Sequence, residues 1–222
     1  MKNFKYLYSM LVLVALIMTG CATQSSRAVA VQQTQAAKTP YTGPRSPIAV
    51  GKFENDSGFM RGIFSDGVDR LGDQAKTVLV SHLQQTNRFL VLDRDNMDMA
   101  KQEAELSGTT QETIGASYVI TGSVSEFGRK EVSDRELFGI LGRGKQQVAY
   151  SKVTVSVVDI RTSAVVYSVQ GAGEVALSDR EVIGFGTSAG YDYTLNGKVL
   201  DLAIREAVDR LSEGIDSGAW KL

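Results

Sequence analysis

The stretch SDRELFGI at residues 133–140 returns as SDREVIGF at residues 178–185. In both copies, four identical polar residues are followed by two apolar residues, a glycine and another large apolar residue. Each copy lies between segments typical of β-strands, so each predicts the tip and descending limb of a β-hairpin. We place these hairpins at residues 127–150 and 169–194, with the charged SDRE segments at their tips.

The limbs of these hairpins match the pattern of membrane strands in part. Such a strand needs about 9 to 11 residues, with alternate residues facing lipid and lumen. Three limbs have an apolar row, which in the first hairpin includes Val148 and Tyr150 and in the second begins at Val169. The limb 127–132 fails, because Arg129, Lys130 and Glu131 put charge on both rows. The predicted lipid-facing residues are Phe138, Ile140, Val175, Leu177, Ile183, Phe185, Tyr191 and Tyr193.

Two hairpins cannot close a barrel, and open strand edges are not tolerated in lipid. A membrane location therefore requires an oligomer in which each copy contributes four strands. In the alternative, the hairpins are water-exposed extensions of a periplasmic sheet. Alternation is a weak signal in any one strand, and the pattern alone slightly favours this alternative.

The N-terminus predicts export and a lipid anchor. Lys2 and Lys5 precede an apolar run at residues 11–18, which is too short to span a membrane as a helix and is typical of a signal peptide. The following Thr-Gly-Cys resembles a bacterial lipobox, so we predict a signal peptide at 1–20 and acylation, including palmitate, at Cys21. Ala22 in place of Asp favours the outer membrane, by resemblance to sorted bacterial lipoproteins. The alternative is an ordinary signal peptide with an incidental cysteine.

The rest of the chain divides into a tether and one domain. Residues 21–46 are rich in Gln, Thr, Ser, Ala and Pro and predict a flexible tether. Residues 47–222 alternate strand and helix patterns before a β-meander, which predicts a three-layer-like α/β domain with a mixed sheet in the periplasm. Predicted strands lie at 48–53, 89–92, 118–127, 148–160 and 164–169, and predicted helices lie around 75–83, 95–106 and 199–211.

Several function classes find no support in these residues. The 24 basic and 25 acidic residues form no basic block, so no nucleic-acid partner is expected. Residues 139–145 have phosphate-loop spacing, but Gln146 stands where Ser or Thr would hold Mg²⁺, so no nucleotide is expected. His82 is the only histidine, and a half-buried helix position explains it better than a metal site or a catalytic triad. We expect no enzyme activity, cofactor or metal.

The chain also resembles the curli secretion-channel family, the CsgG-like lipoproteins. The resemblance runs from Pro47 to Leu222 and rests on FENDSG at 53–58, RFLVLDR at 88–94, YVITGSV at 118–124, the strand at 153–160 and GIDSGAW at 214–220. It implies an outer-membrane lipoprotein that forms a homo-oligomeric ring, in which each subunit adds two hairpins to one shared barrel. Such a pore passes unfolded curlin-like or surface-attachment polypeptides, with accessory secretion proteins and without nucleotide.

The resemblance further implies that the loop after the first strand narrows the pore. Here that loop spans residues 55–72, and its candidate constriction residues are Phe59, Ile63 and Phe64. Packing of these side chains onto the domain is an equal alternative. A second functional alternative remains open, a monomeric periplasmic lipoprotein that binds and regulates a cell-envelope partner. The second hairpin is shorter than in the curli channel, which is a departure from the family pattern.

Overall fold

The computed structural model describes residues 31–59, 67–135, 143–180 and 194–221. The chain divides into two units, residues 1–32 and residues 33–222. Every described helix and strand belongs to the second unit.

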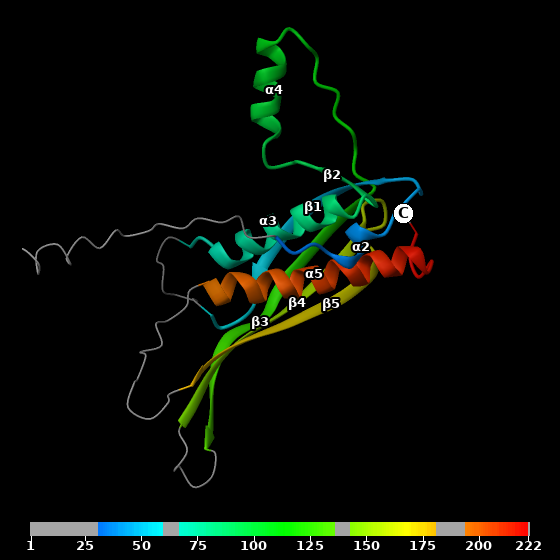
Figure 1. The fold of residues 1–222 in the computed structure, drawn as a ribbon. Helices are drawn as coiled ribbons and strands as arrows, with labels where there is room; N and C mark the ends of the chain where they lie inside the picture. Colours follow the sequence, from blue (N-terminus) through cyan, green and yellow to red (C-terminus); the bar gives the residue numbers. More distant parts are fainter. Residues whose placement is uncertain (1–30, 60–66, 136–142, 181–193, 222) are drawn as a thin grey trace, which may run out of the picture. The chain divides into compact units, whose positions relative to one another are not determined.

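Five strands form one mixed sheet in the order β2-β1-β3-β4-β5 (Figure 1). Strand β1 (Ser46–Asn55) pairs in parallel with β2 (Phe89–Leu92) on one side and β3 (Tyr118–Arg135) on the other. Strands β4 (Arg143–Asp159) and β5 (Val165–Arg180) continue from β3 as an antiparallel meander. The predicted α/β class and mixed sheet are confirmed.

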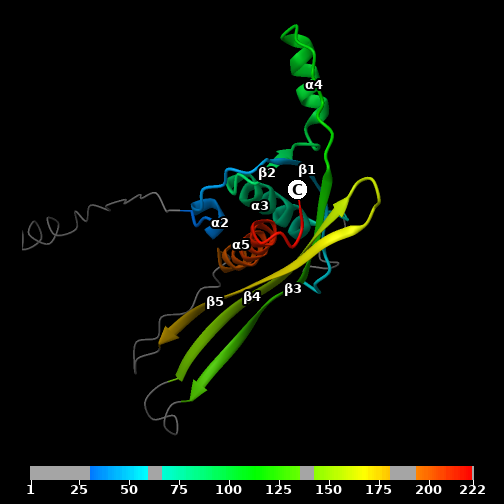
Figure 2. The ribbon, with the colours of Figure 1, turned by 90° about the vertical axis from the view of Figure 1, so that its right-hand side faces the viewer.

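Helices α3 (Arg70–Gln85) and α5 (Thr194–Asp216) lie together on one face of the sheet (Figure 2). Helix α3 packs on β1, and α5 packs on β4 and β5. Helix α4 (Met97–Leu106) has no buried residue and adds no layer. The described residues therefore form two layers, where the sequence predicted a three-layer-like arrangement.

The period-two pattern of β4 sets the core. Val153, Val155 and Val157 are fully buried against the helices, whereas Thr154 and Ser156 lie half-buried on the open face. The helix layer contributes fully buried side chains at the spacing of one helical stripe, among them Leu79, Leu83, Val199, Ala203, Ile204, Ala207 and Leu211.

Trp220 closes one end of this core. Its indole stacks on Phe89 and Tyr167, with ring centroids 6.2 Å and 5.8 Å apart, and meets Tyr118 edge-on at 5.9 Å. The indole N–H donates to the carbonyl oxygen of Leu211 at 3.1 Å. The chain end thus joins both helix α5 and the sheet.

Thr34 and Ala36 are buried against the domain, and Arg45 donates to the carbonyl oxygen of Phe89, although the sequence assigned residues 21–46 to the tether. Helix α2 (Gln35–Lys38) begins at the buried Thr34, and its first N–H groups donate to the carboxylate of Asp209 on α5. The buried guanidinium of Arg88 donates to the carbonyl oxygen of Ala36 at 3.0 Å and to Asp216 at 2.6 Å. The predicted boundary was late because these contacts come from side chains distant in sequence, which the local composition does not show.

No helix in the described residues is long and apolar enough to cross a membrane.

Candidate membrane hairpins

The paired strands continue past the helix layer (Figure 1). Among the β4 residues whose side chains the structure describes, Val148 and Ala149 are the buried ones nearest the hairpin. Beyond them, β3 and β4 remain in register from Glu131–Gln147 to Arg135–Arg143. These residues extend the sheet by roughly 16 Å at about 3.3 Å per residue, or about half of the 9 to 11 residues of a tilted membrane strand.

Residues 133–135 and 178–180 of the repeated charged segments lie within paired strands, where the sequence predicted the tips, and Glu136 and Glu181 lie outside the described residues. Asp134 of β3 lies opposite Gly144 of β4, and Gly144 lies opposite Arg180 of β5. The two SDR segments therefore flank the same end of β4. The sequence pattern placed the turn too early because strongly polar residues usually mark turns, and only the pairing register shows that the strands go on.

The two apolar rows predicted for the described limbs lie on opposite faces of the sheet. Tyr150 lies opposite Glu174, and Ala149 lies opposite Val175. The row containing Val148 and Tyr150 thus shares a face with Glu174, whereas Val175 is half-buried and packs against the core under α5. Alternation within one strand shows which residues share a face of the sheet, but it does not show which of the two faces that is. The apolar rows of the two limbs were both predicted to face lipid, although they lie on opposite faces.

Close contact with α5 explains the apolar row of β5. A Cβ atom added at Gly171 would collide with the carbonyl oxygen of Ala203 and the backbone nitrogen of Ala207. A Cβ at Gly173 would meet Leu202 at 2.9 Å. Along residues 169–175 this row faces the helix, and the two glycines allow the helix backbone to approach the strand.

Charged side chains are paired at the base of the hairpins. Lys130 of β3 forms a 3.0 Å ion pair with Glu174 of β5 across β4, and its ammonium lies 5.9 Å from the ring centroid of Tyr150. The guanidinium of Arg129, next along β3, donates to Asn196 of α5 at 2.8 Å. The base therefore carries charge on both faces of the sheet, as the sequence of residues 127–132 indicated.

The start of the predicted constriction loop is folded onto the domain. The Asn55 side chain donates to the carbonyl oxygen of Phe59 at 2.9 Å and accepts a hydrogen bond from the Ser57 hydroxyl at 2.5 Å. The Phe59 ring meets Phe127 edge-on, with centroids 4.7 Å apart. Phe59 thus has the core contact that the alternative interpretation expected, and Ile63 and Phe64 lie outside the described residues.

The remaining predicted site residues are not placed. Cys21, Phe138, Ile140, Ile183, Phe185, Tyr191 and Tyr193 lie outside the described residues, and only the backbone of Leu177 is described.

His82 is more deeply buried than predicted. It is 3% exposed, and its Nε2 lies 2.7 Å from a carboxylate oxygen of Asp201, which also pairs with Arg205 at 3.1 Å. The pair links α3 to α5. Among the described residues no group of three His, Cys, Asp or Glu side chains could hold a metal ion.

The open face of the sheet carries a polar groove that the sequence pattern did not single out. Its lining includes Lys52, Glu54, Thr121, Thr154 and Ser156. Lys52 and Glu54 form an ion pair, and the hydrogen bond to the Glu54 carboxylate raises the pKa of the Lys52 ammonium. The groove is polar and charged, unlike the helix-covered face.

A family comparison matches residues 27–221 to the model described as "Curli production assembly/transport component CsgG". The chain belongs to the CsgG family. A curated relative in Neisseria meningitidis serogroup B, named "Putative lipoprotein NMB1126/NMB1164", is 60% identical over 207 residues and covers 93% of both chains. The chain is thus a CsgG-family lipoprotein.

Solved structures resemble this CsgG-family chain only distantly. The PelC dodecamer from Paraburkholderia phytofirmans is 16% identical, with a TM-score of 0.38, over 77% of this chain and 91% of that one. Lipoprotein GNA1162 from Neisseria meningitidis is 14% identical, with a TM-score of 0.35, over 78% and 98%.

Proposed function

We propose that this CsgG-family lipoprotein forms a ring in the outer membrane and acts as a nucleotide-independent secretion pore for unfolded polypeptide. The observation that carries the proposal is the continuation of β3, β4 and β5 as paired strands past the helix layer. The family description, a curli assembly and transport component, supports the same function.

In this proposal each subunit contributes both hairpins to one barrel. Residues 131–147 and 177–193 supply the membrane part, with Phe138, Ile140, Ile183 and Phe185 as candidate lipid-facing residues. The paired charges at Lys130 and Glu174 lie at the headgroup level, next to the folded body. Passage of the secreted polypeptide through the pore needs no catalytic group or cofactor, because the polypeptide moves by diffusion and confinement in a polar lumen.

Electron microscopy of the detergent-extracted, lipidated protein tests the pore. We expect closed rings, and conductance steps after reconstitution into planar bilayers. The double variant Ile183→Asp/Phe185→Asp should abolish both, since a charge on a lipid face costs about 2 to 4 kcal/mol near the bilayer midplane. Ser188→Asp, on the alternate row of the same limb, is the matched control and should retain them. Purified monomers without conductance would contradict the proposal.

A second candidate is a monomeric lipoprotein that binds and regulates an envelope partner through its strand edges. One observation favours it: Arg129 and Lys130 are consecutive in β3, and their charged groups lie on opposite faces of the sheet, one bonded to Asn196 of α5 and the other paired with Glu174. A hairpin that carries charged side chains on both faces is compatible with water on both sides, whereas a membrane strand needs one apolar face. In that case Ile183→Asp/Phe185→Asp would leave membrane association unchanged, because the acyl chains at Cys21 would still hold the protein.

A further inference from the structure

The two edges of the sheet are protected to different degrees. Strand β2, at one edge, has only four residues, and the charged residues 93–95 follow it directly. The Arg45 guanidinium also covers this strand, because it donates to the carbonyl oxygen of Phe89 at 3.1 Å. Short length, charge and covering side chains are the features by which proteins keep an edge strand from pairing with another chain. The β2 edge is therefore protected.

Strand β5, at the other edge, lacks these features. It is sixteen residues long, and residues 165–173 contain no charged residue and no proline. The register shift in its pairing with β4 lies at Val166, so residues 167–173 pair regularly with β4. Among the described residues no strand pairs with the opposite side of β5, so the main-chain groups on that side have no partner in a β-ladder. Such an edge is a template for a further strand.

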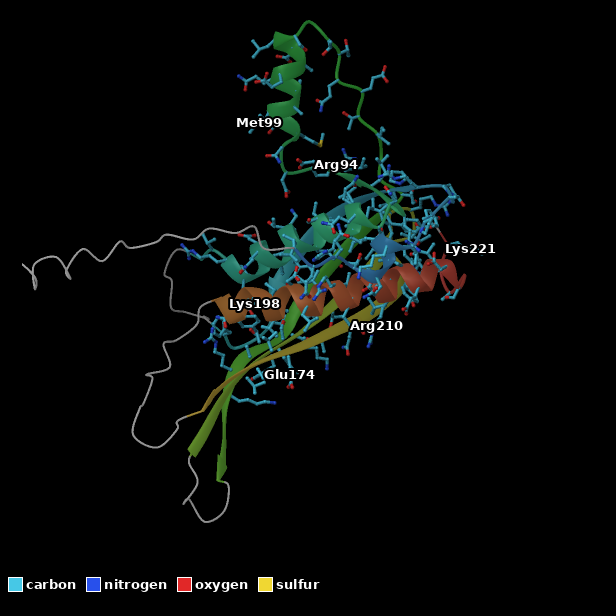
Figure 3. The ribbon with its side chains drawn as sticks, in the orientation of Figure 1. Arg94, Met99, Glu174, Lys198, Arg210 and Lys221 are labelled. Atoms are coloured by element: carbon cyan, nitrogen blue, oxygen red, sulfur yellow. The ribbon has the colours of Figure 1, made fainter. Side chains whose placement is uncertain are left out.

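A groove of about 670 Å³ runs along this edge, and we name it the β5–α5 groove. One wall consists of residues 167–170, whose side chains alternate between the two faces, so the groove follows the strand edge and not one face. The other wall consists of Arg210, Glu213, Gly214 and Ser217. Their spacings from the first of them are three, four and seven positions, which places them on one side of helix α5. Arg210 projects from α5 on the side where β5 lies (Figure 3).

The β5–α5 groove has the dimensions of a short extended segment of polypeptide. The β5 wall spans about 13 Å at about 3.3 Å per residue, and the α5 wall spans about 10 Å at about 1.5 Å per residue. The Tyr167 ring packs on Gly214, where an added Cβ would meet it at 2.7 Å. The β5 wall is uncharged, and the α5 wall carries one cation and one anion, both exposed, at Arg210 and Glu213. The groove therefore has no net charge with which to select a charged ligand.

We propose that the β5–α5 groove binds an extended segment of an unfolded polypeptide, which joins the sheet as a further strand beside β5. Main-chain hydrogen bonds supply the affinity in this mode of recognition, as in PDZ domains, and they place little demand on the sequence of the bound segment. An unfolded chain exposes its main-chain groups, whereas a folded protein has already paired them. The inference rests on the proposed pore, because it names where on the folded body the polypeptide to be secreted is held.

Hydrogen exchange of the lipidated, detergent-extracted protein tests this site. The probe is reduced, carbamidomethylated α-lactalbumin, which is unfolded, and native α-lactalbumin is the folded control. We expect the unfolded probe to slow amide exchange in residues 165–173 and to leave exchange in β2 unchanged, because a new strand protects the N–H groups at the β5 edge. Native α-lactalbumin should change neither strand. Binding of the probe should depend only weakly on salt, since it does not rest on ion pairs.

A bulky side chain in the groove should block the probe. Ser217→Trp fills the groove from the α5 wall, where Ser217 is exposed. We expect it to weaken binding of the fluorescently labelled probe, measured by anisotropy, by about tenfold or more. Ser81→Trp places the same side chain at an exposed serine of α3 outside the groove, and it should leave binding unchanged. Circular dichroism of both variants shows whether the domain is folded, and the exchange experiment on the unaltered chain does not depend on them.

The outcomes separate the docking site from the pore. Absence of probe binding, binding without protection of β5, or undiminished binding to a folded Ser217→Trp variant overturns the docking site. Protection of the β5 edge in the free ring that is lost in a monomer also overturns it, because a second copy would then occupy the edge. Closed, conducting rings with any of these results leave the pore standing. A monomer whose β5 edge is protected by the probe retains the docking site and contradicts the pore.

Discussion

Trp220 is the residue through which the chain end stabilises the domain. It is 5% exposed, and its ring contacts Phe89, Tyr118 and Tyr167. We predict that Trp220→Ala lowers the free energy of unfolding by about 3 to 5 kcal/mol, since a large aromatic side chain leaves a cavity. Urea unfolding of the non-lipidated Cys21→Ser form, followed by circular dichroism, measures this.

The matched change Trp220→Phe retains an aromatic ring but loses the N–H bond to Leu211. Its cost should be clearly smaller than that of Trp220→Ala. Equal costs for the two variants would mean that the indole N–H, and not the ring packing, dominates.

Asp93 at the base of α4 gives a pH-dependent prediction. The hydrogen bond from the Asn96 side chain, helped by the backbone N–H groups, holds the pKa of the Asp93 carboxyl below its usual range. Because the pKa is lower in the folded state, the ionised Asp93 carboxylate stabilises the folded state at neutral pH. This stabilisation is lost as the pH falls from about 3.9, the ordinary pKa of an Asp carboxyl, through the lower pKa of the folded state.

Carboxyl chemical shifts in an NMR titration measure this pKa. Asn96→Ala removes the main cause and should move the pKa of Asp93 back towards its usual range. An unchanged titration in Asn96→Ala would show that the side-chain bond does not act on Asp93.

At the scale of elements, Gly171 sets the distance between β5 and α5. A Cβ there would meet backbone atoms of α5, which cannot move aside as a side chain would. We predict that Gly171→Val destabilises the domain by at least about 1 to 3 kcal/mol, the usual cost of overpacking. Gly115→Ala is the control, because a Cβ at Gly115 has nothing within 4 Å, and its unfolding midpoint should hardly change.

Elements were predictable where the pattern was local. The buried valines of β4 and the stripe of α5 fixed a strand and a helix from their periods alone. The face of the sheet on which each residue lies was not predictable, because it is set by pairing with the neighbouring strand. Val175 is paired with Ala149 of β4, and both lie on the face that α5 covers. The extent of β3 was missed for a similar reason, since polar residues 133–135 continue the strand by pairing with β4.

The candidate site could be predicted only in part. The pairing of β3 with β4 agrees with the first hairpin located from the repeated SDRE segments, whereas the descending limb of the second lies outside the described residues. The packing of Phe59 on Phe127 depends on a contact between residues distant in sequence, so no local pattern could reveal it.

At the scale of the whole molecule, membrane targeting by the N-terminus can be tested separately from folding of the domain. We infer that an acylated Cys21 tethers the chain, and the resemblance of Ala22 after it to sorted bacterial lipoproteins predicts delivery to the outer membrane. We predict that Ala22→Asp retains acylation but shifts the protein to the inner-membrane fraction of a sucrose gradient, whereas Cys21→Ser releases it from lipid anchoring. Ala22→Ser, a small uncharged change, should stay in the outer membrane.

The same variants separate anchoring from assembly. A barrel that closes only in its target membrane requires delivery, so Ala22→Asp should also reduce ring formation and secretion while the isolated domain keeps its unfolding midpoint. If Ala22→Asp still fractionated with the outer membrane, the hairpins or a bound partner, and not the residue after Cys21, would determine location.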